Sequence, residues 1–402
     1  MYDLLNGFRV IEGSAFIAGP SSTLHLAQMG AEVIRFDPIS GGPDYRRWPI
    51  TSQGDSLYWE GLNKCKKSIA IDLRRPEGRD LALALATAPG SNAGVFVTNF
   101  PVDGFLSHAA LKARRDDIIS VRIMGWASGA PAVDYTVNAA VGIPMMTGPS
   151  DSTGPINHVL PAWDLMAGAY AAFATVSAVL RRGTSGVGAE LRVPMSDLAA
   201  STMSHLGQVA EVLSHGDRRR SGNDLYGAFG RDFVTVDGRR VIIVAITPRQ
   251  WTGLLKVLEI AADVADLEQR TGANFAADEG ARFVHRAPLF ALVERAIAQR
   301  PYEMLAAAFD TGGVTWAEYQ SLHQAVRTDE RLFTASPLFQ HVEQPSGLSY
   351  PSSGPAATLA NEPRGTLRGA PRLGEHTDEI LETVLGFAPP AIRRLRDEGL
   401  VA

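Results

Sequence analysis

The first 123 residues alternate short apolar runs with helix-like stretches, and this alternation constrains the fold more than any other feature. Between the apolar runs lie two stretches expected to be helical, from about Ser22 to Met29 and from Pro76 to Ala88. Parallel strands need a crossover connection, which is usually a helix, so the alternation predicts βαβ units and an α/β fold with a doubly wound, mostly parallel sheet. The expected strands cover residues 8–12, 31–36, 68–73, 94–99 and 118–123.

The texture of the sequence changes near residue 215, which indicates a second domain. A polar, basic stretch is followed by two β-like runs, residues 233–236 and 241–245, joined by an Asp237-Gly238 pair typical of a hairpin turn. Helical segments follow, so this part is expected to be a smaller α+β domain. After Phe333 the chain is rich in Pro, Gly and Ser, which predicts an extended crossing. The predicted parts are a large α/β domain at 1–213, a linker at 214–224, the small domain at 225–333, an extended linker at 334–371 and a return to the large domain at 372–402.

Composition disfavours several classes of protein. At 402 residues, with 45% hydrophobic and 20% charged residues, the chain fits an ordinary globular protein of two domains. Its formal charge of −5 argues against a broad nucleic-acid surface, so no nucleic-acid partner is expected. A single cysteine, Cys65, precludes an internal disulfide, and no secretory signal is visible in residues 1–13. We therefore expect a cytoplasmic protein.

Motifs that bind common cofactors are missing from this sequence. The glycines after the first apolar run lack the G-x-G-x-x-G spacing of a dinucleotide site, and neither a P-loop nor a G-x-S-x-G elbow is found. The nine histidines form no H-x-x-x-H pair, so no metal site is expected. A nicotinamide-dependent oxidoreductase is therefore disfavoured.

Asp164 stands directly before sixteen uncharged residues, Leu165 to Leu180, and the residues alone allow three interpretations of it. It fits a helix N-cap, whose loss would cost about 0.5–2 kcal/mol. The apolar run could span a membrane, but it is shorter than the roughly 20 residues that a bilayer needs, so no membrane contact is expected. Asp164 also fits a nucleophilic carboxylate, stabilised as an anion by the helix N-terminus.

A basic cluster containing Asn63, Lys66 and Lys67 precedes the third apolar run. It fits either a solvated loop or a phosphate site, in which the lysines meet a polyanionic ligand. Arg46 and Arg47, in the loop after the second run, are expected to join the same surface, because ligands of open α/β sheets bind at the carboxyl ends of the strands. An equivalent strand end carries Asn99 and Phe100, whose backbone groups and aromatic ring could hold an adenine.

Characteristic motifs follow one another along nearly the whole chain, at residues 5–12, 18–20, 26–35, 63–72, 98–100, 161–164 and 370–381. In this order they resemble the class III CoA-transferases, a family that includes formyl-CoA transferase, carnitine CoA-transferase and α-methylacyl-CoA racemase. The resemblance implies that Asp164 is the covalent nucleophile, that coenzyme A is part of the substrate, and that no cofactor is tightly bound. It also implies that two chains thread through each other as an interlocked homodimer, joined by the long linkers.

The family resemblance and the basic residues together predict the contacts of an acyl-CoA. Backbone N–H groups at the start of the Asp164 helix are expected to stabilise the tetrahedral oxyanions. Candidate anchors for a dicarboxylate substrate are His158, Tyr226 and Arg231. The residues expected to contact CoA are Arg35, Arg46, Arg47, Asn63, Lys66, Lys67, Asn99 and Phe100.

A finer similarity narrows the activity. Residues 36–38, 44–45, 157–164 and 225–233 resemble a subgroup that moves CoA between the two carboxylates of one dicarboxylic acid. Transfer between two different acids stays an alternative, since it would use the same Asp164. Racemisation is a weaker alternative, because the stretch that corresponds to the racemase's histidine, residues 132–138, contains none. A CoA-binding protein without activity is disfavoured by the presence of the aspartate.

Overall fold

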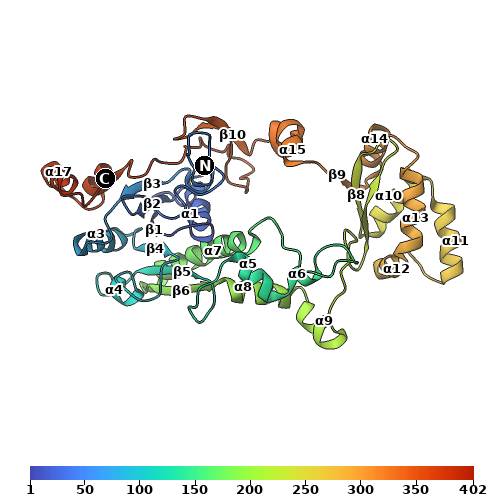
Figure 1. Cartoon of the computed structure of the whole chain (residues 1–402), viewed down its shortest axis with the longest axis horizontal. Helices are drawn as coiled ribbons and strands as arrows, with labels where there is room; N and C mark the ends of the chain where they lie inside the picture. Colours follow the sequence, from blue (N-terminus) through green and yellow to red (C-terminus); the bar gives the residue numbers. More distant parts are fainter. The chain divides into compact units, whose positions relative to one another are not determined.

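The computed structural model describes all residues, 1–402, and they form two compact units. The first unit contains Met1–Val141, His158–Ser214 and Ser336–Ala402. The second contains Gly142–Asn157 and His215–Ala335 (Figure 1). The sequence predicts residues 142–157 as part of the large domain. The structure corrects this, because the segment belongs to the second unit.

The first unit is built on a six-stranded parallel sheet in the order β3-β2-β1-β4-β5-β6. This is a doubly wound order, in which the chain starts in the middle and changes direction between β1 and β4. Five strands correspond to the five predicted apolar runs, but β6 was missed, because it is a partly exposed edge strand with charged residues. The strands are β1 (Arg9–Gly13), β2 (Glu32–Asp37), β3 (Lys67–Ala70), β4 (Val95–Thr98), β5 (Ile119–Met124) and β6 (Ala189–Pro194).

Different helices cover the two faces of this sheet. Ile34 and Phe36 of β2 share a core with buried residues of α3, α16 and α17. Glu12 and Arg35 point to the opposite face, where Thr23 of α1 donates a hydrogen bond of 2.5 Å to Glu12. The helices of the unit are α1 (Ala18–Gln28), α2 (Leu57–Asn63), α3 (Pro76–Ala86), α4 (His108–Lys112), α5 (Asp134–Val141), α7 (Ala162–Ser185), α8 (Met195–His205), α16 (Thr377–Thr383) and α17 (Pro389–Asp397), with α9 (Gln208–His215) at its end.

Helices α1 and α7 pack closely against each other. α1 begins at Ala18, earlier than predicted, and Pro20 is tolerated in its first turn, because proline has no N–H group and the first turn offers no acceptor for one. Gly168 of α7 permits the close contact, since a Cβ atom there would lie 2.1 Å from the hydroxyl oxygen of Ser21. By length and apolar composition α7 could cross a membrane, but in this unit its small residues are buried against the fold.

The second unit combines a three-stranded antiparallel sheet with helices around an aromatic core. The predicted hairpin turn is present, with Gly238 at a φ of 79°. Its first strand begins earlier than predicted, at Phe229, which is fully buried beside Trp251. The elements are β7 (Phe229–Val234), β8 (Arg240–Ala245), β9 (Thr315–Glu318), α6 (Ile143–Met146), α10 (Pro248–Leu258), α11 (Ala261–Thr271), α12 (Glu279–Val284), α13 (Arg286–Ile297), α14 (Tyr302–Gly312), α15 (Leu322–Thr328) and the π-helix η1 (Glu330–Thr334).

Arg220 attaches residues 142–157 to the second unit. Its guanidinium donates to the backbone oxygens of Met145, Ser152 and Gly154 at 2.7 Å each. A guanidinium can satisfy several carbonyls at once, so one side chain organises this irregular segment. Position 220 had been expected to lie in a plain exposed linker.

The segment predicted to be an extended linker, residues 334–371, is partly ordered as a hairpin of the first unit. It contains β10 (Phe339–Glu343) and β11 (Ser349–Ser353), and the Tyr350 hydroxyl donates to Glu60 at 2.7 Å. The indole of Trp59 donates to the backbone oxygen of Pro371 at 2.9 Å. Pro351 within β11 hid this strand from prediction, because proline occurs in sheets only at edges.

Candidate active site

The carboxyl ends of β1 and β4 diverge at the point where the strand order reverses, which is where open α/β sheets bind their ligands. The loops that leave these two strands are tied together by the side chain of Asn99. Its amide oxygen accepts from the backbone N–H of Ala15 at 3.1 Å, and its amide nitrogen donates to the Ala15 oxygen at 2.8 Å. Asn99 therefore fixes the shape of the crevice with its side chain.

A cavity of about 540 Å³ opens beside this crevice and brings three of the predicted site residues together. Asp164, Asn99 and Phe100 all line it. Arg122 supports the loop that carries Phe100, because its guanidinium donates to the backbone oxygens of Pro101 at 2.6 Å and of Leu106 at 2.9 Å. Segments 15–18, 99–103, 123–125 and 128–133 complete the lining, together with Met195.

Asp164 lies within the first turn of α7 and is not its N-cap. Pro161 occupies the cap position and offers no side-chain hydrogen bond. The capping carboxylate comes from Asp134, which accepts from the backbone N–H groups of Trp163 at 2.6 Å and of Asp164 at 3.2 Å. The N-cap interpretation of Asp164 is therefore wrong, and its own carboxylate is left free of the helix amides.

The predicted oxyanion donors at the start of α7 are likewise not available. Besides the two amides bound by Asp134, the N–H of Ala162 donates to Leu160 and the N–H of Leu165 donates to Pro161. Each amide of the first turn already has an acceptor, so none is left to stabilise a developing oxyanion.

The carboxyl group of Asp164 has a raised proton affinity. Burial and the negative charge of Asp134 raise its pKa to about 6, while Arg47 acts in the opposite direction. Burial disfavours the charged form, and a like charge nearby adds to the effect. At neutral pH the group is still mainly ionised, and it is more basic than an ordinary aspartate.

His158, predicted as a substrate anchor, faces Asp134. Its Nε2 lies 3.1 Å from Oδ1 of Asp134, and its ring packs edge-on against Tyr135. Asp134 is 1% exposed and thus joins His158 to the first turn of α7. No local pattern indicates this role, because Asp134 and Asp164 are thirty residues apart in the sequence.

Three of the residues predicted to contact CoA belong to a buried ionic network. The ammonium group of Lys66 donates to Glu12 at 2.8 Å and to Pro20 and Asn63 at 2.9 Å, which uses all its donors. Arg35 binds Asp37, Asp44 and Asn63, and is 1% exposed. Contact of these groups with CoA would require the network to open. It stays a prediction.

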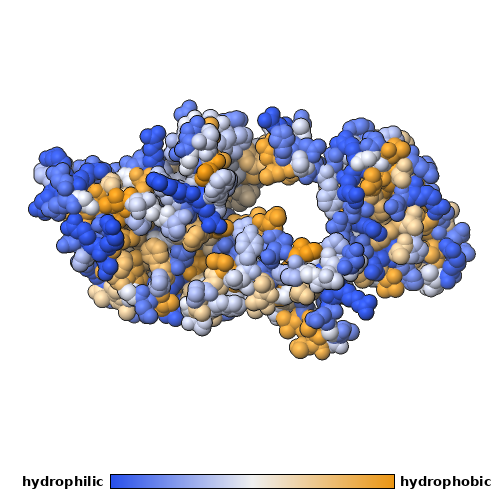
Figure 2. All heavy atoms as spheres, viewed as in Figure 1, coloured by the Kyte–Doolittle hydropathy of each residue, from blue (hydrophilic) through white to orange (hydrophobic).

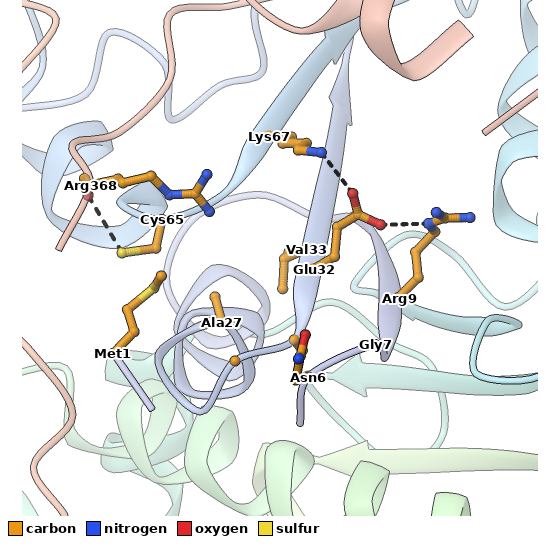
Figure 3. Close-up of a pocket in the computed structure, with 12 residues that line it drawn as sticks. Met1, Asn6, Gly7, Arg9, Ala27, Glu32, Val33, Cys65, Lys67 and Arg368 are labelled. Carbon is orange, nitrogen blue, oxygen red and sulfur yellow. Dashed lines mark hydrogen bonds and ion pairs between the residues drawn. The ribbon is translucent and has the colours of Figure 1, made fainter. Parts of the chain in front are cut away.

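Lys67 lies at the opposite, amino-terminal edge of the strands. It is directed at Glu32, at 2.7 Å, and Arg9 approaches the same carboxylate from the other side (Figure 3). A cavity of about 410 Å³ lies there, lined also by Cys65 and Arg368. The expectation that Lys67 shares one surface with Arg46 and Arg47 is therefore wrong. Lys67 is the first residue of β3, and its side chain lies at the amino-terminal edge of the sheet, away from the carboxyl ends of the strands.

Arg46 and Arg47 both lie in the loop between β2 and α2, but their side chains have different surroundings. Arg46 lines a separate cavity of about 420 Å³ with Trp59 and Glu60. The guanidinium of Arg47 lies over two aromatic rings, 5.3 Å from the centre of Phe16 and 5.4 Å from that of Tyr58. Phe16 lines the Asp164 cavity, and the charge of Arg47 opposes the rise in the pKa of Asp164, so Arg47 is the cation of this loop that lies next to the candidate active site.

Tyr226 and Arg231, the remaining predicted anchors, are part of the second unit. The ring of Tyr226 carries the guanidinium of Arg218 at 3.7 Å, and Arg231 pairs with Asp224 at 3.6 Å. No group of three His, Cys, Asp or Glu side chains in the chain is arranged to hold a metal ion.

Comparison with known proteins assigns the family. The sequence pattern described as CoA-transferase family III matches residues 5–377. The chain belongs to CoA-transferase family III. It is 46% identical to the 2-methylfumaryl-CoA isomerase of Chloroflexus aurantiacus over 404 residues, which cover 100% of this chain and 98% of that protein. The family acts on CoA thioesters, so the cavity around Asp164 lies in an enzyme.

More distant family III proteins share both the length and the fold. The chain is 27% identical to the succinyl-CoA:glutarate CoA-transferase of Mus musculus, covering 99% of this chain and 90% of the relative. A solved structure of a CAIB/BAIF family protein from Brucella suis superposes with a TM-score of 0.75 at 24% identity, covering 96% of this chain and all of that one. This structural likeness concerns the fold alone.

Proposed function

We propose that this family III enzyme is an intramolecular CoA transferase that converts 2-methylfumaryl-CoA into 3-methylfumaryl-CoA, moving CoA between the two carboxylates of mesaconate. The observation that carries the proposal is the 46% identity to a 2-methylfumaryl-CoA isomerase over the full length of both chains. The position of Asp164 in the cavity at the strand ends supports it.

In the proposed reaction the ionised Asp164 attacks the thioester carbonyl, which forms a mixed anhydride with the mesaconyl group and expels CoA as its thiolate. The thiolate then attacks the acyl carbon of Asp164 itself, giving an aspartyl-CoA thioester and free mesaconate. The other mesaconate carboxylate attacks that thioester, which re-forms an anhydride and CoA thiolate. Attack of the thiolate on the mesaconyl carbon releases the product thioester and restores Asp164. Each step exchanges one acyl bond for another.

The surroundings of Asp164 suit this chemistry. Its raised pKa makes Asp164 a stronger nucleophile than an ordinary carboxylate. With a pKa of about 6, Asp164 is still ionised in most of the molecules at neutral pH. Its partial burial limits the access of water. An anhydride intermediate requires this protection, because water would hydrolyse it. We assign the acyl-CoA to the cavity next to Asn99 and Phe100, with no further cofactor.

We also propose that the enzyme acts as an interlocked homodimer in the cytoplasm. Apolar side chains at positions 166, 170, 173 and 180 lie along one exposed face of α7. A second apolar patch covers α9 (Figures 1 and 2), with Val209, Val212 and Leu213 exposed. Exposed apolar faces of this kind mark interaction surfaces. Sedimentation of an active monomer at micromolar concentration would contradict the dimer.

The function is tested with 2-methylfumaryl-CoA as the only substrate, the two regioisomers being separated by chromatography. A parallel reaction contains labelled free mesaconate. Isomerisation without incorporation of label is the expected result, because the acid is retained. Label in the thioester would indicate transfer between separate acids, as in the succinyl-CoA:glutarate relatives. No change of the thioester would show that the proposed function is wrong.

A further inference from the structure

Arg47 has no carboxylate partner in the chain. Asp37, at the end of β2, and Asp44, in the loop that follows, are both bound by Arg35, at 2.8 and 3.0 Å. Asp55, further along the same loop, accepts from the Thr51 hydroxyl. The Arg47 guanidinium instead lies over the rings of Phe16 and Tyr58 and is exposed. An exposed guanidinium stacked on aromatic faces keeps its donors free for a carboxylate.

The backbone of Arg47 is held in place from both sides. Its N–H donates to the Asp44 oxygen at 3.2 Å, and its own carbonyl oxygen accepts from the hydroxyl of Ser56 at 2.6 Å. Asp44 is in turn fixed by the buried Arg35, whose guanidinium also lies 4.5 Å from the centre of the Trp59 ring. Asp44 therefore connects the buried ionic network to Arg47 and holds the backbone of Arg47 in position.

Tyr58 adds a second unused polar group. Its hydroxyl oxygen is buried and makes no hydrogen bond of normal geometry, although Arg47 lies close to it. Burial raises the pKa of this phenol, Arg47 opposes the rise, and the carboxylates of Asp164 and Asp44 add to it. A neutral phenol is a hydrogen-bond donor, and buried polar groups without a partner are rare in folded proteins.

Phe16 links this pair to the catalytic carboxylate. It lines the same cavity as Asp164 and lies under the guanidinium of Arg47. Its φ of 67° is a left-handed conformation that a residue with a bulky side chain rarely adopts. Strained residues of this kind concentrate at ligand sites, where the surrounding structure enforces them.

We propose that Arg47 and Tyr58 form the site for the free carboxylate of a dicarboxylic acyl-CoA bound at Asp164. The inference deepens the proposed function and rests on it. Arg47 presents two N–H groups to the carboxylate, and Tyr58 donates its hydroxyl to one of the two oxygens. The sequence predicts Arg47 as a contact of CoA, whereas in this site it binds the acid.

This site explains how an intramolecular transfer retains its acid. Before transfer it holds the carboxylate that carries no CoA, while Asp164 attacks the other end. After CoA has left the first end, that end is a carboxylate too, and the same cation receives it when the acid turns. Charge-assisted, bidentate bonds are the strong ones, so the free acid stays in the cavity between the two halves of the reaction.

The test compares mesaconyl-CoA with crotonyl-CoA, which lacks the second carboxylate. Activity is measured as isomerisation of the former and as exchange of label from free crotonate into the latter. In Arg47→Met we expect kcat/KM for mesaconyl-CoA to fall at least a hundredfold, and the crotonyl-CoA exchange rate to change less than threefold. Arg46→Met removes the neighbouring cation and should change both substrates alike. Tyr58→Phe should lower mesaconyl-CoA turnover about tenfold and increase the labelled acid that enters the product.

The outcomes separate the two levels of the proposal. A wild-type enzyme that leaves mesaconyl-CoA unchanged overturns the proposed function and this inference with it. A wild type that isomerises mesaconyl-CoA, combined with an Arg47→Met variant that loses both substrates equally, overturns the inference alone. Circular dichroism and ligand-free thermal unfolding identify a variant that fails to fold. In that event Arg47→Lys, which keeps the charge but not the bidentate geometry, must lose mesaconyl-CoA selectively, or the inference is wrong.

Discussion

Replacing Asp164 by Asn is expected to abolish CoA transfer and, at the same time, to stabilise the fold at neutral pH. An amide cannot form the anhydride, so turnover should fall by several orders of magnitude. The sequence suggested a modest loss of stability through a lost N-cap. Because Asp134 caps α7, that loss does not arise, and the effect on stability changes sign.

The size of the gain follows from the pKa of Asp164. Its pKa is raised from an ordinary 3.8 to about 6. One pKa unit corresponds to about 1.4 kcal/mol, so the ionised group costs the folded state up to about 3 kcal/mol. Below pH 4 the carboxyl is protonated in both states and the cost vanishes. It grows as the pH rises from 4 to 6, because the unfolded state releases the proton first, and it is complete above pH 6.

Urea unfolding of the wild type and Asp164→Asn at several pH values between 4 and 8 measures this difference. Intrinsic fluorescence can follow the first unit, because Trp163 adjoins the mutated residue. We expect the two proteins to be similar at pH 4 and the variant to be more stable by about 1–3 kcal/mol at pH 8. A wild type that is the more stable protein at pH 8, or a difference that does not depend on pH, would refute the reasoning.

Three further predictions follow from the same contacts. Asp134→Asn keeps an acceptor for the α7 amides but removes the negative charge, which should lower the pKa of Asp164. The acid limb of the pH profile of kcat/KM should therefore move to lower pH, and a limb that does not move would show that burial alone sets this pKa. Lys66→Met leaves Glu12 with a weaker partner and should destabilise the protein by about 3–5 kcal/mol in denaturant unfolding, whereas the partly exposed Lys67→Met should cost at most about 1 kcal/mol. Gly168→Ala should lower the stability by about 1–3 kcal/mol, because the new methyl group would meet Ser21. The control Gly183→Ala, in open space on the same helix, should raise the stability by about 0.5–1 kcal/mol. Equal effects of the two variants in thermal unfolding would contradict the close packing of α1 and α7.

The parallel strands and the binding of ligands at their carboxyl ends could be anticipated from sequence because both depend on local patterns. Apolar runs of a few residues that alternate with helical stretches are typical of buried parallel strands, so β1 to β5 were found. Asn99 and Phe100 follow β4 directly and must lie at its carboxyl end. β6 was missed because its side chains are partly exposed and form no continuous apolar run, and β11 because it is polar and contains Pro351.

The charge environment of the site could not be predicted, because it depends on contacts between distant segments. A run of cations in sequence gives no indication of which one is buried. Lys66 directly precedes β3 and Lys67 is its first residue, yet their ammonium groups meet different carboxylates, those of Glu12 and Glu32. In the same way nothing local distinguishes Arg47, which stays unpaired, from Arg35, which binds three carboxylates.

At the start of α7 the capping carboxylate, Asp134, is a different residue from the proposed nucleophile, Asp164. A carboxylate that caps a helix accepts backbone N–H bonds, which stabilise its charged form and lower its pKa, so it is a poor nucleophile. Here Asp134 accepts those bonds, and Asp164 stands within the first turn with its oxygens free. The capping charge repels the negative charge of Asp164, so the same residue that completes the helix also raises the basicity of the proposed nucleophile. A helix start with two aspartates, one for the amides and one for the substrate, thus provides a reactive carboxylate without leaving the helix uncapped.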